Sequence, residues 1–174
     1  MNDYLGTRVT ASASSIMVGL CQVSDKEKVE QWFIEPLCAM KDDQAFICLT
    51  VCFPLLETIL RYELNIPDNE NVSFSDGSKA LKWFAKFMTI PEVASHEIWD
   101  AFRNGLLHRA MIKGTLPYDL TGRAVVGRPA ELKDGRVVIH VWDLRDKLVN
   151  KLRKHHRKLW RAGGSELPNI YIRA

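Results

Sequence analysis

The chain has 174 residues, of which 47% are hydrophobic and 26% charged, as in one globular domain with a sizeable core and unlike a disordered or disulfide-rich chain. Its net charge of +3 permits an anionic partner without identifying one. The four cysteines lack the spacing of a zinc site or a redox pair, and the apolar run Ile16–Cys21 is too short for a membrane span. We therefore expect a reduced cytoplasmic protein with no metal, no cofactor and no membrane partner.

The first helix is predicted to start at the capping-box sequence S-D-K-E, residues 24–27, so that residues 1–23 form an N-terminal extension. Pro36 should kink this helix or open it locally, because proline lacks an N–H group. The apolar residues of the helix recur at the spacing of one helical face. They are Val29, Trp32, Phe33, Leu37 and Met40.

The second helix is predicted to be the centre of a bundle. Asp42 and Asp43 can cap it, and apolar residues between positions 46 and 60 surround most of its circumference. The next helix can open at Asp76 to Ser78 and continue through K-A-L-K-W-F-A-K-F-M. Pro91 is then well placed to start the helix that contains W-D-A-F-R-N-G-L-L-H-R-A-M-I-K, residues 99–113.

The pattern changes after residue 113, where glycines and prolines break the helix. Residues 122–142 are predicted to form a small β-hairpin with its turn at Asp134 and Gly135, and Asp143 can cap the last helix. Trp142 is expected on an edge strand. The predicted fold class is mostly α: a bundle of four to five helices in one domain, residues 1–174, with the hairpin inserted before the last helix.

Arg103 lies in an unusual place on the helix of residues 99–113. On a helical wheel it falls within the apolar arc, while Asn104 and His108 lie together on the flank of that arc, and Gly105 interrupts the pattern. An unpaired buried charge costs several kcal/mol, so Arg103 must either reach solvent or meet an anion. One interpretation is a structural ion pair with Glu57 or Glu97, although Glu57 is also four residues from Arg61 and can pair with it.

The other interpretation of the same residues is a phosphate site. Arginine can donate two hydrogen bonds to phosphate oxygens, asparagine supplies an orienting donor, and histidine titrates near neutral pH. Those are the parts of a metal-independent ribonuclease with Arg103, Asn104 and His108 as catalytic residues.

The sequence R-N-G-L-L-H, from Arg103 to His108, resembles the signature of the HEPN superfamily: an arginine, a polar residue that is often asparagine, and a histidine after four to six intervening residues. The resemblance covers Lys26–Lys113 and the final helix. It implies a HEPN-like helical bundle that forms a homodimer, with the two motifs facing one cleft. Many members are endoribonucleases, often toxins or phage-defence effectors, and some are non-catalytic modules.

The resemblance also implies roles for the three residues. His108 would act as the acid or base while the ribose 2′-hydroxyl attacks the neighbouring phosphate, Arg103 would stabilise the charge of the pentacoordinate state, and Asn104 would orient the histidine or the phosphate. In the best-known toxin subgroup a tyrosine lies two residues after the histidine and is modified by an antitoxin. Here that position is Ala110, which argues against this form of control.

The final helix carries many basic residues on and around an apolar stripe. They are interpreted either as a surface for RNA phosphates or as a solvated face whose cations favour the C-terminal end of the helix dipole. The candidate RNA-binding residues are Arg109, Lys151, Lys154, Arg157 and Lys158.

The sequence thus predicts an endoribonuclease that needs no metal and cleaves RNA in a composite dimer site. Its expected partners are RNA or a nucleotide, a second copy of the chain, and an antitoxin or other inhibitor protein. The alternative is a non-catalytic HEPN module that binds a nucleotide or a protein. A helical adaptor in which Arg103 and His108 are structural is the third possibility.

Overall fold

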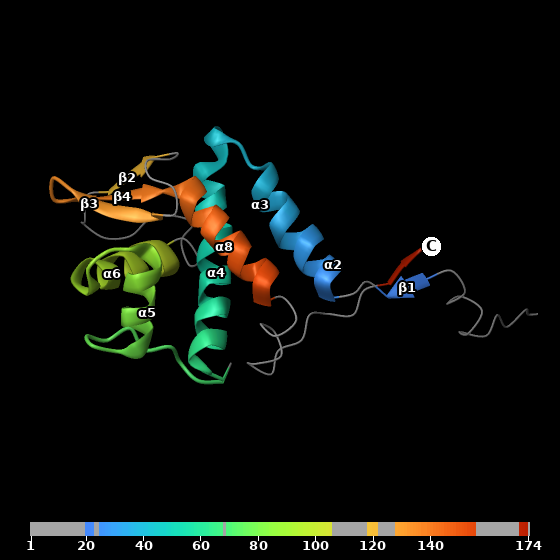
Figure 1. Cartoon of the computed structure of the whole chain (residues 1–174), viewed down its shortest axis with the longest axis horizontal. Helices are drawn as coiled ribbons and strands as arrows, with labels where there is room; N and C mark the ends of the chain where they lie inside the picture. The colour runs from blue at the N-terminus through green and yellow to red at the C-terminus, as the bar shows by residue number, and fades with distance from the viewer. Residues whose placement is uncertain are drawn as a thin grey trace, which may run out of the picture. The chain divides into compact units, whose positions relative to one another are not determined.

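The structure is a computed structural model, and it divides the chain into two compact units (Figure 1). The smaller unit comprises Met1–Ser24 and Pro168–Ala174, and in it strand β1 (Leu20–Gln22) pairs antiparallel with β5 (Tyr171–Arg173). The larger unit, Asp25–Leu167, contains the helices and a second sheet. The structure describes residues 20–22, 25–67, 69–105, 118–121, 128–155 and 171–173.

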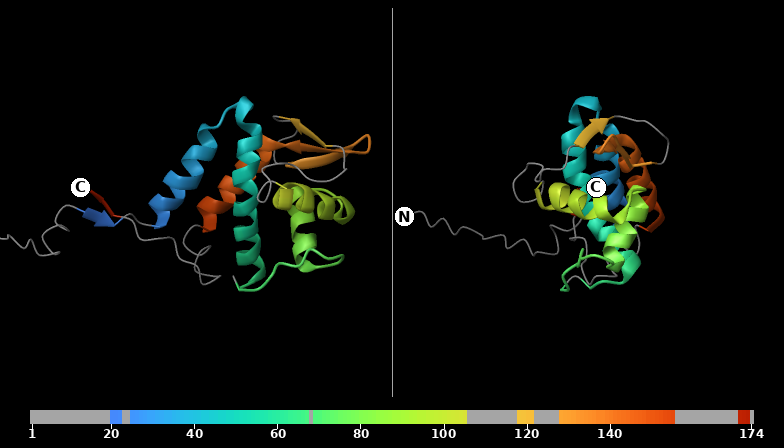
Figure 2. Two further views of the ribbon diagram at one scale, coloured as in Figure 1. Left: turned by 180° about the vertical axis from the view of Figure 1, so that it is seen from behind. Right: turned by 90° about the vertical axis from the view of Figure 1, so that its left-hand side faces the viewer.

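The larger unit is mostly helical, and a β-hairpin precedes its last helix, which confirms the predicted fold class at this level. Helices α4 (Ala45–Leu64) and α8 (Val141–His155) run between two groups of helices (Figures 1 and 2). One is the helix formed by α2 (Asp25–Val29) and α3 (Glu35–Ala39), and the other is formed by α5 (Lys79–Met88) and α6 (Glu92–Ile98). The sheet lies at the N-terminal end of α8. The buried apolar residues of α4 and α8 join those of α5 and of the helix after α6 in one core.

The first helix is continuous but not uniform. The α-helical segments α2 (Asp25–Val29) and α3 (Glu35–Ala39) are joined by the π-helical segment η1 (Glu30–Ile34), in which the N–H of Glu35 bonds to the carbonyl of Glu30. This wider turn directly precedes Pro36, as the predicted local opening requires. It also changes the phase of the helix, so Ile34 is buried, whereas Trp32 and Phe33 are only half-buried.

Helix α4 (Ala45–Leu64) is the central helix, as predicted, and follows the one-turn helix η2 (Asp42–Gln44). The capping contact differs from the prediction, because the N–H of Lys41 bonds to Oε1 of Gln44 at 2.9 Å, and Asp42 and Asp43 instead put negative charge in the first turn. Eight residues of α4 are buried. They are Cys48, Leu49, Cys52, Phe53, Leu55, Leu56, Ile59 and Leu60.

Among the described residues, the segment Asp42–Leu64 has the length and composition of a membrane-crossing helix, with a mean hydropathy of 1.6 over its most apolar window. Within the protein 44% of that window is buried, where α4 contacts α5, α8 and the helical segment after α6. Helix α4 also carries Glu57 and Arg61 in its C-terminal half, where they form an ion pair.

The next two helices begin where the sequence predicts. Helix α5 (Lys79–Met88) is capped by Ser78, whose hydroxyl accepts a 3.1 Å bond from the N–H of Leu81. Helix α6 (Glu92–Ile98) follows Pro91 and continues into the π-helical segment η3 (Trp99–Asn104). Gly105 keeps helical angles (φ −66°, ψ −53°), so it does not interrupt the helix as the sequence pattern suggested.

A three-stranded sheet has the order β2-β4-β3. Strands β3 (Ala130–Lys133) and β4 (Arg136–His140) form the predicted hairpin, and the turn residues Asp134 and Gly135 both have positive φ angles, of 51° and 73°, as a tight hairpin turn requires. Strand β2 (Tyr118–Thr121) adds parallel to β4 and was not predicted.

The start of the last helix corrects two predictions. Helix α8 (Val141–His155) begins directly after β4, so Asp143 lies inside its first turn rather than capping it. Trp142 is in the helix, 5% exposed, and not on an edge strand. The sequence V-I-H-V-W suits a strand, but the buried pattern of α8 begins at Val141, and packing of its first turn overrides the strand preference.

Candidate functional site

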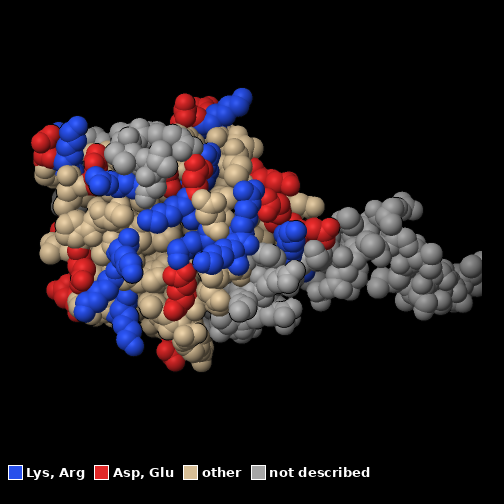
Figure 3. All heavy atoms as spheres, viewed as in Figure 1, with Lys and Arg blue, Asp and Glu red and all other residues tan. Residues whose placement is uncertain are grey.

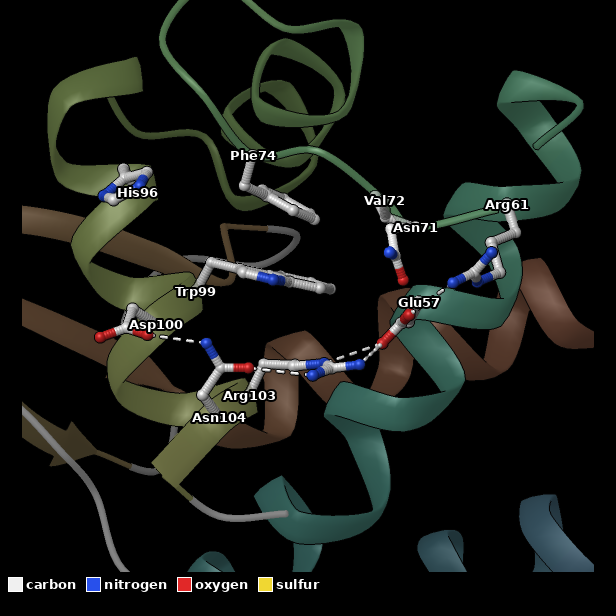
Figure 4. A pocket seen from close by; sticks show the side chains of 10 residues that line it. All are labelled: Glu57, Arg61, Asn71, Val72, Phe74, His96, Trp99, Asp100, Arg103 and Asn104. Carbon is white, nitrogen blue, oxygen red and sulfur yellow. Dashed lines mark hydrogen bonds and ion pairs between the residues drawn. The ribbon is translucent and has the colours of Figure 1, made fainter. Parts of the chain in front are cut away.

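Arg103 reaches from η3 to the central helix α4 and meets Glu57 there (Figure 4). Its Nε donates to Oε2 of Glu57 at 2.9 Å, and Nη2 lies 2.9 Å from the same oxygen. The carboxylate side chain is 14% exposed and the arginine side chain 28%. Of the two partners that the sequence offered, the structure thus selects Glu57, and Glu97 is an exposed residue of α6.

Glu57 is shared between two arginines. Its other oxygen, Oε1, accepts a 3.1 Å bond from Nη2 of Arg61, the residue one turn further along α4. Nη1 of Arg61 in turn donates to the carbonyls of Pro67 and Glu70, at 3.0 and 2.9 Å, in the loop after α4. Both expected contacts of Glu57 are therefore formed, and the carboxylate links the motif helix, the central helix and this loop.

Asn104 extends the same chain of contacts on the other side of Arg103. Its Oδ1 accepts a 2.9 Å bond from Nη1 of Arg103, and its Nδ2 donates to Oδ1 of Asp100 at 2.7 Å. Figure 4 shows the resulting relay, which runs from Asp100 through Asn104, Arg103 and Glu57 to Arg61. Asn104 thus holds the guanidinium of Arg103, and any contact that it makes with His108 lies outside the described residues.

The relay borders a hollow of about 320 Å³. Its aromatic wall is a stack of Phe74 on Trp99, with ring centroids 3.9 Å apart and planes 15° from parallel. The remaining side chains that line it are polar or small (Figure 4). They are Glu57, Arg61, Asn71, Val72, His96, Asp100, Arg103 and Asn104.

The guanidinium of Arg103 retains binding capacity toward this hollow. Each terminal nitrogen of a guanidinium carries two N–H groups. In Arg103, Nη2 makes one contact, with Glu57, and Nη1 makes one contact, with Asn104. Within the described part of the chain, one N–H on each terminal nitrogen therefore has no partner. Two such donors on one planar group match the spacing of two phosphate or carboxylate oxygens.

The backbone of the motif helix is π-helical from Trp99 to Asn104. In a π-helix each residue advances by less than the 100° assumed on the wheel, so Arg103 turns toward α4 instead of lying deep in the apolar arc. Phe102 and Trp99, which are buried, fill that arc against Phe53. Such segments occur frequently at functional sites, which is an observation independent of the motif.

Formal charges in the hollow balance. Arg61 and Arg103 contribute two positive charges, and Glu57 and Asp100 two negative ones. An anion in this hollow would therefore depend on oriented donors rather than on a large excess of positive charge. His96 lines the same hollow.

The structure describes some of the predicted site residues and not others. It brings Arg103 and Asn104 together, whereas His108, Arg109, Arg157 and Lys158 lie outside the described residues. Of the remaining candidates for RNA binding, Lys151 forms an ion pair with Glu63, and Lys154 is exposed on α8.

Two contributors to the site were missed by the sequence reasoning. Asp100 is four residues before Asn104, a helical spacing that indicates a contact and could have been used. Phe74 lies in the loop before α5, and its stacking on Trp99 depends on tertiary packing that no local pattern predicts.

Metal-ligating groups are not gathered in the described part of the chain: no three His, Cys, Asp or Glu side chains there could hold an ion. Cys38, Cys48 and Cys52 are free thiols, and the last two are buried in contact with each other, with Sγ atoms 3.8 Å apart. The side-chain nitrogen donors that line the hollow include those of Arg61, Arg103, Asn104 and Asn71.

No protein-family model, curated protein or solved structure matches the chain.

Proposed function

We propose that the chain is a HEPN-like endoribonuclease that needs no metal and works as a homodimer in the cytoplasm. The observation that carries the proposal is the guanidinium of Arg103, which is partly exposed beside a hollow and fixed from two sides by Glu57 and Asn104. A donor that is already oriented stabilises developing negative charge without reorganising during the reaction. The motif R-N-G-L-L-H and the π-helical backbone beneath it support the same proposal.

In the proposed reaction the ribose 2′-hydroxyl attacks the adjacent phosphorus and loses its proton to a base, for which His108 is assigned by its place in the motif. The bond from phosphorus to the 5′-oxygen breaks, and that oxygen takes up a proton. The products are a 2′,3′-cyclic phosphate and a 5′-hydroxyl, and water is not consumed. Arg103 donates to the phosphate oxygens while the charge on them increases.

Glu57 has a positioning role in this proposal. It holds the guanidinium through Nε and Nη2, so that the remaining N–H groups keep one direction. Lysine in place of Arg103 keeps the charge but cannot contact Glu57, Asn104 and a phosphate together. The proposal therefore predicts that Arg103→Lys loses most of the activity, even though the net charge is unchanged.

The test is cleavage of RNA by the purified protein in EDTA, with the product ends identified. We expect cyclic phosphate ends, loss of cleavage in His108→Ala, and a fall in kcat of about 100- to 1,000-fold in Arg103→Ala. Arg128→Lys on the exposed segment before β3 is the matched control for Arg103→Lys and should leave cleavage unchanged. Cleavage that persists in His108→Ala refutes the assigned chemistry.

The ion pair with Glu57 also fits a purely structural role for Arg103, and the same variants separate the two. A structural role predicts that Arg103→Ala lowers stability with no activity to lose. A folded dimer that cleaves none of a varied set of RNAs favours the non-catalytic module. Such a module should still show a rise in melting temperature with a nucleotide, because a ligand stabilises the state that binds it.

A further inference from the structure

A second hollow lies between α5 and α8 and shares no residue with the one at Arg103. Its volume is about 300 Å³. Figure 3 shows Lys and Arg side chains gathered over these two helices on the face turned to the viewer. The residues that line it come from α4, α5 and α8: Glu63, Trp83, Lys86, Phe87, Lys147 and Lys151.

The single carboxylate of this hollow is already engaged. Glu63 forms an ion pair with Lys151 and accepts a 2.7 Å hydrogen bond from Nε1 of Trp83. Burial alone would raise the pKa of Glu63, but the hydrogen bonds from Lys151 and Trp83 and the nearby positive charges lower its pKa overall. Glu63 is therefore ionised and compensates Lys151, so it is not available to neutralise a second lysine.

Lys147 is held in place by neutral groups. Its Nζ donates to the carbonyl of Phe87 at 2.7 Å and lies 4.9 Å from the centre of the Phe87 ring. Burial and the neighbouring charge of Lys151 both lower its pKa. Among the described residues no carboxylate pairs with Lys147, and the groups that stabilise its charge there are the carbonyl and the aromatic ring of Phe87.

The three lysines and one carboxylate leave an excess of two positive charges in the hollow. Trp83 stacks on Phe87, with centroids 5.2 Å apart and planes 15° from parallel, and the two rings lie under the ammonium groups of Lys147 and Lys151. The ammonium groups are thus presented on a rigid base, and an anion that enters contacts them with little rearrangement. Lys86 is exposed at the edge and free to close on such an anion.

We propose that the hollow between α5 and α8 binds a phosphate group of an RNA strand through Lys86 and Lys147. The inference rests on the proposed function, because the strand held here is the substrate of the cleavage site. It assigns the anchoring of that strand to α5 and α8 together, whereas the sequence placed the candidate RNA-binding residues at Arg109 and on the final helix. Inorganic phosphate has the same chemistry, so the experiment includes it as a separate probe.

The test measures the affinity for a 12-nucleotide single-stranded RNA between 50 and 300 mM salt, on the His108→Ala protein so that the RNA stays intact. Each phosphate contact with single-stranded nucleic acid contributes about 0.7 to the slope of log K against log salt. The double variant Lys86→Gln/Lys147→Gln should therefore lower the slope by about 1.4 and bind about tenfold or more weakly at 50 mM salt. Lys147→Arg keeps the charge and should retain most of the affinity.

Lys133→Gln on β3 is the matched control, since it removes the same charge from an exposed residue outside the hollow. If Lys133→Gln lowers the affinity for RNA as much as Lys86→Gln does, the strand is attracted by net charge, and the assignment to the hollow is overturned. Lys86→Gln alone removes an exposed side chain without a folding risk and should lower the slope by about 0.7. An unchanged slope in both lysine variants also overturns it.

The two proposals fail in different ways. If the wild-type protein cleaves no RNA but the lysine variants lose binding, the ribonuclease proposal fails and this one stands. If cleavage occurs and the lysine variants bind as the parent does, this inference fails. Inorganic phosphate that competes with the strand at millimolar concentration supports a phosphate contact, while phosphate binding without any RNA binding refutes the assignment to RNA.

Discussion

Replacing Glu57 by glutamine tests the relay most directly, because this carboxylate is the shared partner of Arg61 and Arg103. Glutamine has the same shape, but it loses the charge, and its amide nitrogen turns N–H donors toward a guanidinium that also donates. The three side chains are between 14% and 28% exposed, so water compensates only in part. Losing one charge-assisted hydrogen bond costs about 1.5–3 kcal/mol, and breaking a buried pair about 3–5 kcal/mol. For this partly buried group we expect a loss of about 2–4 kcal/mol.

The free energy of unfolding would be measured by urea denaturation, with the melting temperature as a second readout. For a protein of this size a loss of about 2–4 kcal/mol corresponds to a shift of roughly 4–16 °C. Glu30→Gln is the matched control, since Glu30 also pairs with an arginine, Arg153, at 2.8 Å. That pair is 34% and 53% exposed, so its loss should cost less than about 1 kcal/mol.

The reasoning is refuted if Glu57→Gln costs no more than Glu30→Gln. A double-mutant cycle with Arg103→Gln adds a second criterion. The direct contact predicts a coupling energy between Glu57 and Arg103 of about 1–3 kcal/mol, and a coupling near zero would show that the two side chains do not interact in solution.

Three further predictions concern the core, a cap and the pH dependence of stability. Phe53→Ala removes a fully buried ring that contacts Phe84, Trp99 and Phe102, and should cost about 3–5 kcal/mol in urea denaturation; a cost under 1 kcal/mol would contradict the packing. Ser78→Ala removes the cap of α5 and should cost about 1 kcal/mol, whereas Ser73→Ala in the exposed loop should cost little. The pKa of Glu63 is lowered in the folded state. The ionised carboxylate therefore stabilises the fold at pH values above its ordinary pKa of 4.5, and this stabilisation is lost as the pH falls through the lowered pKa of the folded state. Glu63→Gln should remove this part of the pH dependence of the free energy of unfolding. If the free energy of unfolding depends on pH in the same way in the variant, the ion pair with Lys151 contributes nothing to stability.

Local signals in the sequence predicted the starts of α5 and α6, but not those of α4 and α8. The hydroxyl of Ser78 bonds to an N–H three residues on, so its capping role is decided within one turn. The turn at Asp134 and Gly135 is equally local, because few residue pairs accept two positive φ angles in succession. Strand β2 was missed for the opposite reason, since its parallel pairing with β4 depends on a contact between distant segments.

The two π-helical segments show the limit of periodicity arguments. Hydrophobic spacing assumes 3.6 residues per turn, and a wider turn shifts every later residue around the helix axis. In η1 this shift buries Ile34, and in η3 it turns Arg103 toward α4. Proline explains the first segment, whereas no residue in the sequence of the second signals it.

The sequence predicted some of the residues that form the candidate site, but not how they are arranged in space. The sequence identified Arg103 and Asn104 and offered Glu57 or Glu97 as a partner, and the choice between them depends on where η3 crosses α4. The lysine hollow was beyond prediction for the same reason. Lys86 and Lys147 are distant in sequence, and only the tertiary arrangement of α5 and α8 brings them to one hollow.

The position of Arg103 among apolar neighbours follows from what lies across from it. An arginine in that arc is unfavourable unless another element supplies a carboxylate, and α4 does so with Glu57, which Arg61 holds in turn. Glu57 lies between two guanidiniums, Asp100 supplies the second negative charge of the hollow, and the Phe74–Trp99 stack forms one of its walls. A guanidinium whose donors are already oriented stabilises an anion without having to reorganise. Under the proposed function, the contacts that make Arg103 structurally tolerable would also orient it toward a phosphate, and stability and RNA cleavage should then be lost together in Glu57→Gln.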